Sequence, residues 1–385
     1  MGTGFLKKIA VSVEKKQDTL FTYPVTKQQK YVAHFPEPRD GIERGYFQYC
    51  CQMKLYGRLL YTALNMAALP LSWRYMMKFR RASEETGAHA DAVFFDDGKP
   101  FNIIPDVVQE EYKEIVTLSS DNRTLNKADK KFLKKIFRKY PFSWLLRLKL
   151  ILKIAQYSYA ITKYDPRAII SCSEYSFTSP FLTEYCHTRG VKLINVMHGE
   201  KMYEMKDAFS KFDEFYVWDQ AYVDLLCDLR ADKDQFRIAV PQSLRIEGRD
   251  AAKIEYDYTY YLAAESVDAM KKIAEALKRL HDGGKKISVR PHPRYSDAKT
   301  VSELFGFANI EDARSITIER SLLQTGTAVS LFSTVLNQAQ SNSIPIVIDD
   351  ISNPAHFEKL KELRFACMSR EHKLLSQVVG EGYDK

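Results

Sequence analysis

The sequence predicts an α/β protein with two Rossmann-like domains facing a central cleft, and three observations support this prediction. Short runs rich in β-branched and aromatic residues alternate with helical patterns from about residue 166 onward. The same alternation starts again after residue 245. The chain has 385 residues, which is more than a single core usually supports. Such alternation predicts parallel sheets covered on both faces, with ligands bound at the carboxyl ends of the strands.

The first domain is predicted to span residues 1–245. Ser179 is expected to cap a helix that takes Pro180 into its first turn, and Asp219 is expected to cap a later helix. A basic amphipathic helical insertion is expected at about 106–165. The predicted strands of this domain are 167–171, 191–197, 214–218 and 236–240.

The second domain is predicted to span residues 246–385. A helix with apolar residues at helical spacing runs from Val267 to Leu280, and Gly283 and Gly284 close it. Ser333 and Thr334 open another helix directly after a strand. The predicted strands of this domain are 258–264, 286–289, 327–332 and 344–350.

Composition is that of an ordinary globular protein, with 45% hydrophobic and 28% charged residues. No apolar run reaches the roughly 18 to 20 residues that a membrane-spanning helix needs, and the N-terminus lacks a clear secretory signal. The six cysteines follow no disulfide or zinc pattern. We therefore expect a cytoplasmic protein without a structural metal.

The net charge of +8 is concentrated in residues 127–153, which hold ten Lys or Arg residues and only Asp129 as an acid. Aromatic and leucine side chains lie between these charges, as in segments that contact an anionic membrane surface. A helix packed on the core with a solvated basic face fits the same pattern. No nucleic-acid-binding motif accompanies it, and we expect no nucleic-acid partner. A second amphipathic stretch that ends in basic residues spans 59–81.

Two loops of the second domain carry groups that suit a phosphate. Arg290, His292 and Pro293 follow one strand, and two prolines hold the histidine rigidly between arginines. Ser333 and Thr334 follow another strand and add hydroxyl groups to the positive end of a helix dipole. Alone, Ser333 would be interpreted as a helix cap and His292 as a buried structural histidine; together they predict a phosphate clamp.

Two loops of the first domain carry candidate bases. Asp96, Asp97 and Gly98 end an apolar run, and this pattern is typical of a turn. Too few oxygen ligands accompany the two carboxylates to predict a metal site, whereas one of them could take a proton from an acceptor hydroxyl.

A histidine provides the second candidate base. His198 and Gly199 stand directly at a strand exit and are followed by Glu200. A structural histidine is the alternative interpretation of this position. If it is functional, His198 would line the cleft together with Glu200, on the acceptor or sugar side.

These motifs, in this order, resemble the bacterial sialyltransferases of the GT-B type, which have two Rossmann-like domains. The matching elements are DDG at 96–98, HP at 292–293 and ST at 333–334. The resemblance implies that Asp97 is the general base and that His292, Ser333 and Thr334 bind the phosphate of a CMP-sugar.

The MHG sequence at 197–199 departs from that pattern. Together with the downstream RPHP at 290–293, it resembles capsule glycosyltransferases and the polyol phosphotransferases of teichoic acid synthesis. The second of these families implies a CDP-polyol donor, a peripheral membrane position and His198 as the base.

The predicted function is an inverting glycosyltransferase of bacterial surface polysaccharide synthesis. It would move an acidic sugar, sialic acid or Kdo-like, from CMP to a glycan or glycolipid held by the first domain. We expect no cofactor and no metal, and a cytoplasmic location at the inner face of the plasma membrane. The alternatives are a CDP-polyol phosphotransferase and a non-catalytic sugar-binding protein; burying Asp97, His198 and His292 without function would be costly in the latter.

Overall fold

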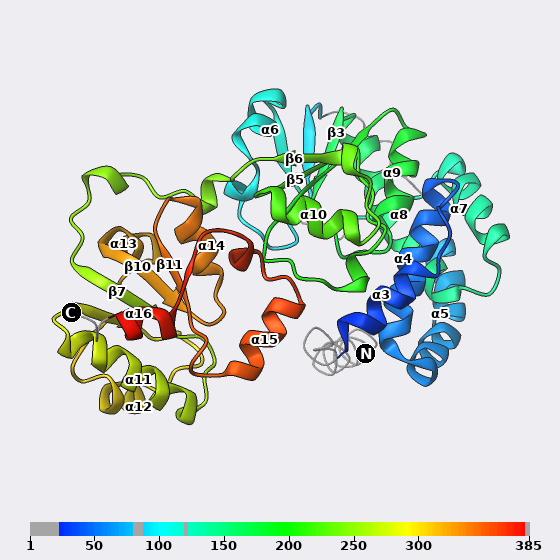
Figure 1. The fold of residues 1–385 in the computed structure, drawn as a ribbon. Coiled ribbons are helices and arrows are strands. Elements are labelled where there is room, and N and C mark those ends of the chain that lie inside the picture. The colour runs from blue at the N-terminus through cyan, green and yellow to red at the C-terminus, as the bar shows by residue number, and fades with distance from the viewer. Residues whose placement is uncertain (1–22, 80–87, 119–121, 382–385) are drawn as a thin grey trace. The chain divides into compact units, whose positions relative to one another are not determined.

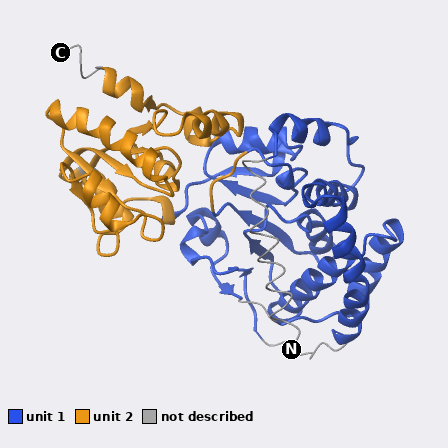
Figure 2. Cartoon of the chain, turned by 90° about the horizontal axis from the view of Figure 1, so that it is seen from below, with its two compact units in different colours: residues 1–198, 203–242 blue, residues 199–202, 243–385 orange. Residues whose placement is uncertain are grey.

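The computed structural model describes residues 23–79, 88–118 and 122–381 and divides the chain into two compact units. The first unit comprises Met1–His198 and Tyr203–Gln242; the second comprises Gly199–Met202 and Ser243–Lys385 (Figure 2). The predicted division after residue 245 lies close to the main boundary between the units. The short excursion of residues 199–202 into the second unit was not predicted.

The first unit is built on a parallel six-stranded sheet with the strand order β2-β1-β3-β4-β5-β6. Its strands are β1 (Ala92–Phe94), β2 (Ile115–Thr117), β3 (Ala168–Ser171), β4 (Lys192–Val196), β5 (Glu214–Val217) and β6 (Phe236–Ile238). Strands β1, β3 and β4 are buried almost throughout, as expected for a parallel sheet covered on both faces. The four predicted strands of this domain are confirmed.

Eight described α-helices belong to the first unit, and Figure 1 shows α4, α5 and α7 together on one flank, beyond α8 and α9. They are α3 (Val25–Ala33), α4 (Gly41–Tyr56), α5 (Arg58–Lys78), α6 (Asp106–Glu111), α7 (Lys127–Lys139), α8 (Trp144–Tyr164), α9 (Ser179–His187) and α10 (Gln220–Asp228). Asp219 caps α10, as predicted, by accepting from the backbone of Ala221. Pro180 lies in the first turn of α9, as predicted, but Ser179 is not the cap, because the helix already begins there.

The segment 106–165 is not a purely helical insertion. It contains β2, whose Ile115–Thr117 pairs with β1 at the edge of the sheet. Its basic residues, 127–153, belong to two separate helices, α7 and the first half of α8, rather than to one continuous segment at the surface. Helix α8 is largely buried, with Leu150 and Ile154 fully enclosed, whereas the lysines of α7 are mostly exposed. The core-packed alternative therefore holds for α8.

The second unit repeats the same plan, with a parallel sheet in the order β12-β11-β10-β7-β8-β9. Its strands are β7 (Tyr256–Tyr261), β8 (Ile287–Arg290), β9 (Asn309–Ile310), β10 (Thr325–Ser330), β11 (Ile346–Ile348) and β12 (Lys373–Leu374). The four predicted strands are again confirmed, and the two-residue edge strands β9 and β12 were not predicted. The predicted α/β class with two Rossmann-like units in tandem is confirmed.

Helices cover the second sheet on the pattern that the sequence predicts. Helix α11 ends at Asp282, and Gly284 then takes a left-handed φ of 87°, which a glycine adopts without strain. Leu277 of α11 and Leu375 of α16 join the buried core with Val289 and Val329 of the sheet. The helices are α11 (Val267–Asp282), α12 (Ala298–Leu304), α13 (Ile318–Gln324), α14 (Thr334–Ser341), α15 (Pro354–Glu362) and α16 (Leu375–Glu381).

Short 3₁₀ turns complete the described chain: η1 (Phe101–Ile103), η2 (Met205–Asp207), η3 (Lys233–Gln235), η4 (Gln242–Leu244), η5 (Arg249–Ala251) and η6 (Ala366–Ser369). Within residues 23–79, 88–118 and 122–381, no helix combines the length and apolarity needed to cross a bilayer.

Candidate functional site

Each sheet has one point where the order of the strands reverses. In the first unit the chain runs from β1 outward to β2 and then returns to β3 on the other side of β1. In the second unit it runs from β7 through β8 to β9 and returns to β10 on the other side of β7. Ligands of open α/β sheets bind at the carboxyl ends of the strands beside such a reversal. Of the predicted site residues, Asp96, Asp97 and Gly98 follow β1, and Ser333 and Thr334 follow β10; the others follow or end the neighbouring strands β4 and β8.

Asp96, Asp97 and Gly98 follow β1 as a tight turn. Lys99 donates its backbone N–H to the carbonyl of Asp96 at 2.7 Å. The φ angles of Asp97 and Gly98 are 44° and 79°, as in a type I′ turn. The Asp97 side chain is exposed, and its charge opposes the lowering of the pKa of Lys153 that burial causes. Both carboxylates therefore lie at the predicted edge, but Asp97 is on a solvent-exposed turn.

His198 follows β4, two strands from β1, and lies against a buried carboxylate. Its Nδ1 is 3.4 Å from Oε1 of Glu174, a residue that follows β3 and has no solvent exposure. The imidazole is 15% exposed, so one part of the ring remains accessible to a substrate. A carboxylate behind an imidazole fixes the orientation of the ring and stabilises its protonated form.

Neighbouring backbone and amide groups hold Glu174 in place. The amide of Asn195, on β4, donates to Oε2 of Glu174 at 3.1 Å. The same amide accepts from the backbone N–H of Ser173 at 2.8 Å. Gln48 of α4 donates to the carbonyl of Glu174. Sequence reasoning missed Glu174, although an acid three residues beyond a predicted strand was the available signal.

In the second unit His292 follows β8 in a rigid loop. Its Nδ1 accepts from the backbone N–H of Arg294 at 3.1 Å, and its own backbone N–H donates to Ser296 at 2.9 Å. The ring stacks on Tyr295 at a centroid separation of 4.5 Å. Burial, and secondly the charge of Arg294, lower the pKa of His292 from its usual value. Because Nδ1 is an acceptor, the neutral ring carries its proton on Nε2. Pro293 is exposed in the same loop.

Arg290, which was predicted to be a phosphate ligand, ends β8 and lies in a buried ion pair. Its guanidinium is buried and pairs with Glu311, with 2.9 Å between Nη1 and Oε2. It also donates to the carbonyl of Ile316 at 2.7 Å. Glu311 accepts further hydrogen bonds from the hydroxyls of Ser288 and Ser321. Arg290 therefore links the end of β8, which leads into the His292 loop, to the segment after β9.

Ser333 follows β10 and caps α14, because its hydroxyl accepts from the backbone N–H of Val335 at 3.2 Å. Thr334, the first residue of the helix, is exposed. The cap interpretation is therefore correct for Ser333, and it does not conflict with anion binding. The N-terminus of α14 presents its dipole and a hydroxyl at the strand reversal of this sheet.

Gly199 and Glu200 belong to the second unit, unlike His198. The carboxylate of Glu200 accepts a hydrogen bond from Asn337 of α14. Glu200 was predicted to line the cleft together with His198, on the acceptor or sugar side. The structure instead joins it to the helix that Ser333 caps.

Glu265, which sequence reasoning did not select, follows β7 beside the same reversal. Its carboxylate accepts from the backbone N–H of Ala263 at 2.7 Å. Burial raises the pKa of Glu265, and the charge of Asp349 adds to this. Asp349 itself accepts hydrogen bonds from the hydroxyl of Tyr260 and from the backbone N–H groups of Ile351 and Ser352. Its carboxylate therefore holds the loop that follows β11.

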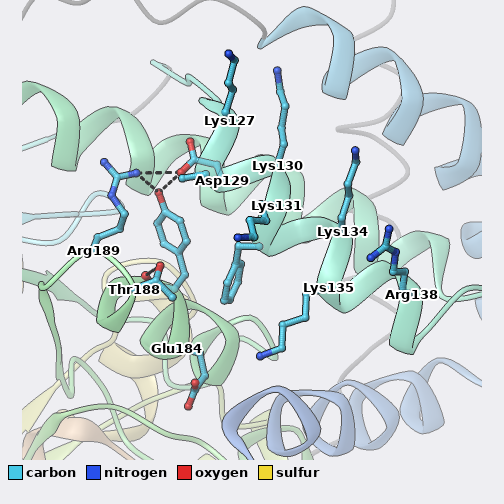
Figure 3. A pocket seen from close by; sticks show the side chains of 13 residues that line it. Lys127, Asp129, Lys130, Lys131, Lys134, Lys135, Arg138, Glu184, Thr188 and Arg189 are labelled. Carbon is cyan, nitrogen blue, oxygen red and sulfur yellow. Dashed lines mark hydrogen bonds and ion pairs between the residues drawn. The ribbon is translucent and has the colours of Figure 1, made fainter.

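A groove of about 920 Å³ lies along α7, and none of these residues lines it (Figure 3). Its walls carry Lys130, Lys134 and Arg138, and Asp129 lies at its base with a buried carboxylate. That carboxylate pairs with Arg189 and accepts from Tyr185, which ties α7 to α9. No group of three or more metal-ligating side chains occurs within the part of the chain that the structure describes.

Comparison with known proteins finds neither a matching family model nor a matching curated protein. Among solved structures, the wall teichoic acid polymerase TagF is 9% identical over 83% of this chain and 87% of its own, with a TM-score of 0.42. A UDP-GlcNAc 2-epimerase of Methanocaldococcus jannaschii is 11% identical over 83% and 89%, with a TM-score of 0.40. The glycotransferase of kitacinnamycin is 12% identical over 72% and 84%, with a TM-score of 0.40. At these values the likeness assigns no activity to this chain.

Proposed function

We propose that this protein is an inverting glycosyltransferase that moves an acidic sugar from a CMP-sugar to a hydroxyl of a bacterial surface glycan or glycolipid. The observation that carries the proposal is the pair of His198 and Glu174 at the carboxyl ends of β4 and β3, next to the strand reversal of the first sheet. A buried carboxylate behind a partly accessible imidazole suits proton abstraction from a hydroxyl. A protein that only binds sugar would gain little from this pair.

In the proposed reaction, the ring nitrogen of His198 that faces away from Glu174 takes the proton of the acceptor hydroxyl. The hydroxyl oxygen attacks the anomeric carbon as the bond from that carbon to the CMP phosphate oxygen breaks. The bonding electrons leave with CMP, and the carboxylate of Glu174 stabilises the imidazolium that forms. His198 replaces Asp97 as the proposed base, because Asp97 lies on an exposed turn, whereas the buried carboxylate of Glu174 backs His198.

The second unit would hold the departing phosphate. His292 can donate from Nε2, and the capped N-terminus of α14 offers backbone N–H groups and the hydroxyl of Ser333. Fixed donors aimed at a developing negative charge usually accelerate such reactions more than any other single effect. Arg290 has no place in this set, because Glu311 neutralises it. The proposal requires no metal, because hydrogen-bond donors of the protein would stabilise the negative charge on the single phosphate of CMP.

A second candidate is a CDP-polyol phosphotransferase. The specific observation that favours it is the same histidine, because resemblance to those enzymes assigns the base to the residue at position 198. Both candidates share a cytidine nucleotide and an anion site in the second unit. They differ in the atom attacked, which is the anomeric carbon in the first and the β-phosphorus in the second.

The test is donor consumption, measured by chromatography in the presence of a bacterial glycolipid extract. CMP-sialic acid, CMP-Kdo, CDP-glycerol and UDP-GlcNAc are supplied separately to wild type, His198→Ala and Asp97→Asn. Consumption of a CMP-sugar that His198→Ala abolishes supports the proposal. Consumption of CDP-glycerol alone selects the second candidate. Consumption of UDP-GlcNAc alone, or activity that depends on Asp97 and not on His198, contradicts the proposal.

A further inference from the structure

Helix α5 has an apolar face that nothing in the described chain covers. Six of the exposed large hydrophobic side chains lie on this helix: Leu59, Leu60, Met66, Leu69, Trp73 and Met77. Leu59 is 88% and Trp73 is 72% exposed, which is far beyond what a side chain of the core shows. A contiguous exposed apolar surface marks an interaction site in a folded protein.

The exposed positions form one stripe along the helix. Leu59, Ala63, Met66, Pro70, Trp73 and Met77 are exposed and follow one another at intervals of three and four residues. The opposite side of α5 packs on α8, where Ser72 donates to the carbonyl of Trp144 and Ala68 is fully enclosed. The helix is therefore apolar on two faces, and only one of them serves the fold.

The loop before α8, which contacts α5, carries another exposed apolar side chain. The amide of Asn65 donates to the carbonyl of Phe142 at 2.9 Å and accepts from the backbone of Leu145 at 3.0 Å. This places Phe142, which is 77% exposed, beside the helix. Two neighbouring segments therefore both carry exposed apolar side chains.

The charges around this face have a single sign. Arg58, Arg74 and Lys78 flank the stripe, and α5 contains no acidic residue. Helix α7, which ends three residues before Phe142, carries seven further Lys or Arg residues, and its only acid, Asp129, is buried. Figure 3 shows Lys127, Lys130 and Lys134 extending away from the cluster of Asp129 and Arg189.

We propose that α5 and Phe142 insert into the surface of an anionic lipid bilayer and hold this protein there. An apolar stripe with basic edges and an exposed tryptophan matches a layer that is apolar inside and negatively charged outside. A second copy of the chain fits less well. A symmetric dimer would set the same basic rim against itself, and α5 offers no carboxylate to neutralise it. The inference assigns membrane contact to a helix outside 127–153 and does not depend on the proposed reaction.

The test uses vesicles of phosphatidylcholine with and without phosphatidylglycerol, and the full chain. Wild type should sediment with the anionic vesicles, and its tryptophan emission should shift to the blue. Trp73 is strongly exposed, Trp144 is partly buried at the start of α8 and Trp218 is buried, so brominated lipids should quench wild type much more strongly than Trp73→Phe. Leu59→Gln/Met66→Gln/Trp73→Gln should lower vesicle affinity at least about tenfold, and Arg74→Glu/Lys78→Glu should weaken the preference for phosphatidylglycerol.

The matched control is Ile254→Gln/Val267→Gln/Ile310→Gln, which removes exposed apolar side chains from the second unit. It should bind vesicles as wild type does. Circular dichroism checks that each variant is folded, and quenching in wild type needs no variant at all. Absence of vesicle binding by wild type overturns the inference, as does binding that the α5 triple variant retains. A wild-type dimer that the triple variant converts to a monomer, without vesicle binding, assigns the face to a second copy instead.

Discussion

The pair of His198 and Glu174 decides which base the proposed chemistry uses. Three candidate groups follow the strands at this edge, but the imidazole of His198 is the one backed by a fully buried carboxylate. Asn195 holds that carboxylate from the neighbouring strand. The arrangement predicts that the two residues act as a unit, so their substitutions should not be additive.

We expect Glu174→Gln to lower kcat by about 10- to 100-fold and His198→Ala by about 10³-fold or more, because removing a positioned base costs at least its general-base contribution. The double variant should be no slower than His198→Ala alone. Steady-state kinetics with the preferred donor measures this, and donor affinity in the second unit should stay unchanged. Additive losses, or a loss of donor affinity in Glu174→Gln, would show that Glu174 only supports the fold.

His292 leads to a second prediction at this scale, which concerns the pH dependence of nucleotide affinity. Burial and Arg294 lower its pKa, so the free protein carries a neutral imidazole at pH 7. A bound phosphate adds negative charge, raises that pKa and causes proton uptake. Nucleotide affinity should therefore rise as the pH falls through the interval between the two pKa values.

Isothermal titration across this pH range, in buffers of different ionisation heat, detects the proton uptake. His292→Gln is the control, because it isolates the imidazole from titration of the nucleotide phosphate itself. Equal pH dependence in both proteins would exclude a contact between His292 and the phosphate.

At the scale of elements, the start of α14 combines a structural and a binding role in one residue. Ser333 accepts from Val335 as the cap of the helix. Aspartate caps helices as well as serine does, but it places a negative charge where the phosphate would lie. One position can therefore separate the two roles.

We expect Ser333→Ala to destabilise the second unit by about 1 kcal/mol. Ser333→Asp should keep that stability and still weaken nucleotide binding at least tenfold, which corresponds to about 1.4 kcal/mol. Urea unfolding and nucleotide titration measure the two effects. Normal nucleotide binding by Ser333→Asp would remove α14 from the proposed phosphate site.

The buried pair of Arg290 and Glu311 ties β8 to the segment after β9. Removing one partner leaves an unpaired buried charge, so Arg290→Met should cost about 3 to 5 kcal/mol. Arg290→Met/Glu311→Leu should recover part of that loss, because it removes both charges. Thermal unfolding of both variants measures this; a stable Arg290→Met that binds nucleotide poorly would restore the predicted phosphate contact.

The sequence allowed the central elements to be predicted, because buried parallel strands are apolar runs with sharp ends. His198, His292 and Ser333 could be selected since each directly follows such a run. The edge strands β9 and β12 could not, because two residues give no periodic signal, and β2 lies within the segment 106–165 that was predicted to be helical. Arg290 was misassigned because its partner Glu311 is 21 residues away and is brought to it only by the pairing of β8 with β9. Glu174 was likewise not recognised as the partner of His198, because the two residues are distant in the sequence and only the pairing of β3 with β4 brings them together.

At the scale of the whole molecule, two parallel sheets each present polar residues at the point where the strand order reverses. In the proposed reaction, the first unit binds the acceptor and supplies the base, and the second unit binds the nucleotide. Helix α5 lies in the first unit and would bring a lipid-linked acceptor to the same unit as the base. We therefore predict that nucleotide binding and membrane binding are lost in different variants.

The most direct test is nucleotide titration of wild type, His292→Ala, Ser333→Asp and His198→Ala with CMP, CDP, UDP and GDP. We predict selective binding of cytidine nucleotides that the first two variants lose and His198→Ala retains. Selectivity for UDP or GDP, binding that survives both substitutions in the second unit, or absence of nucleotide binding would contradict the proposed function.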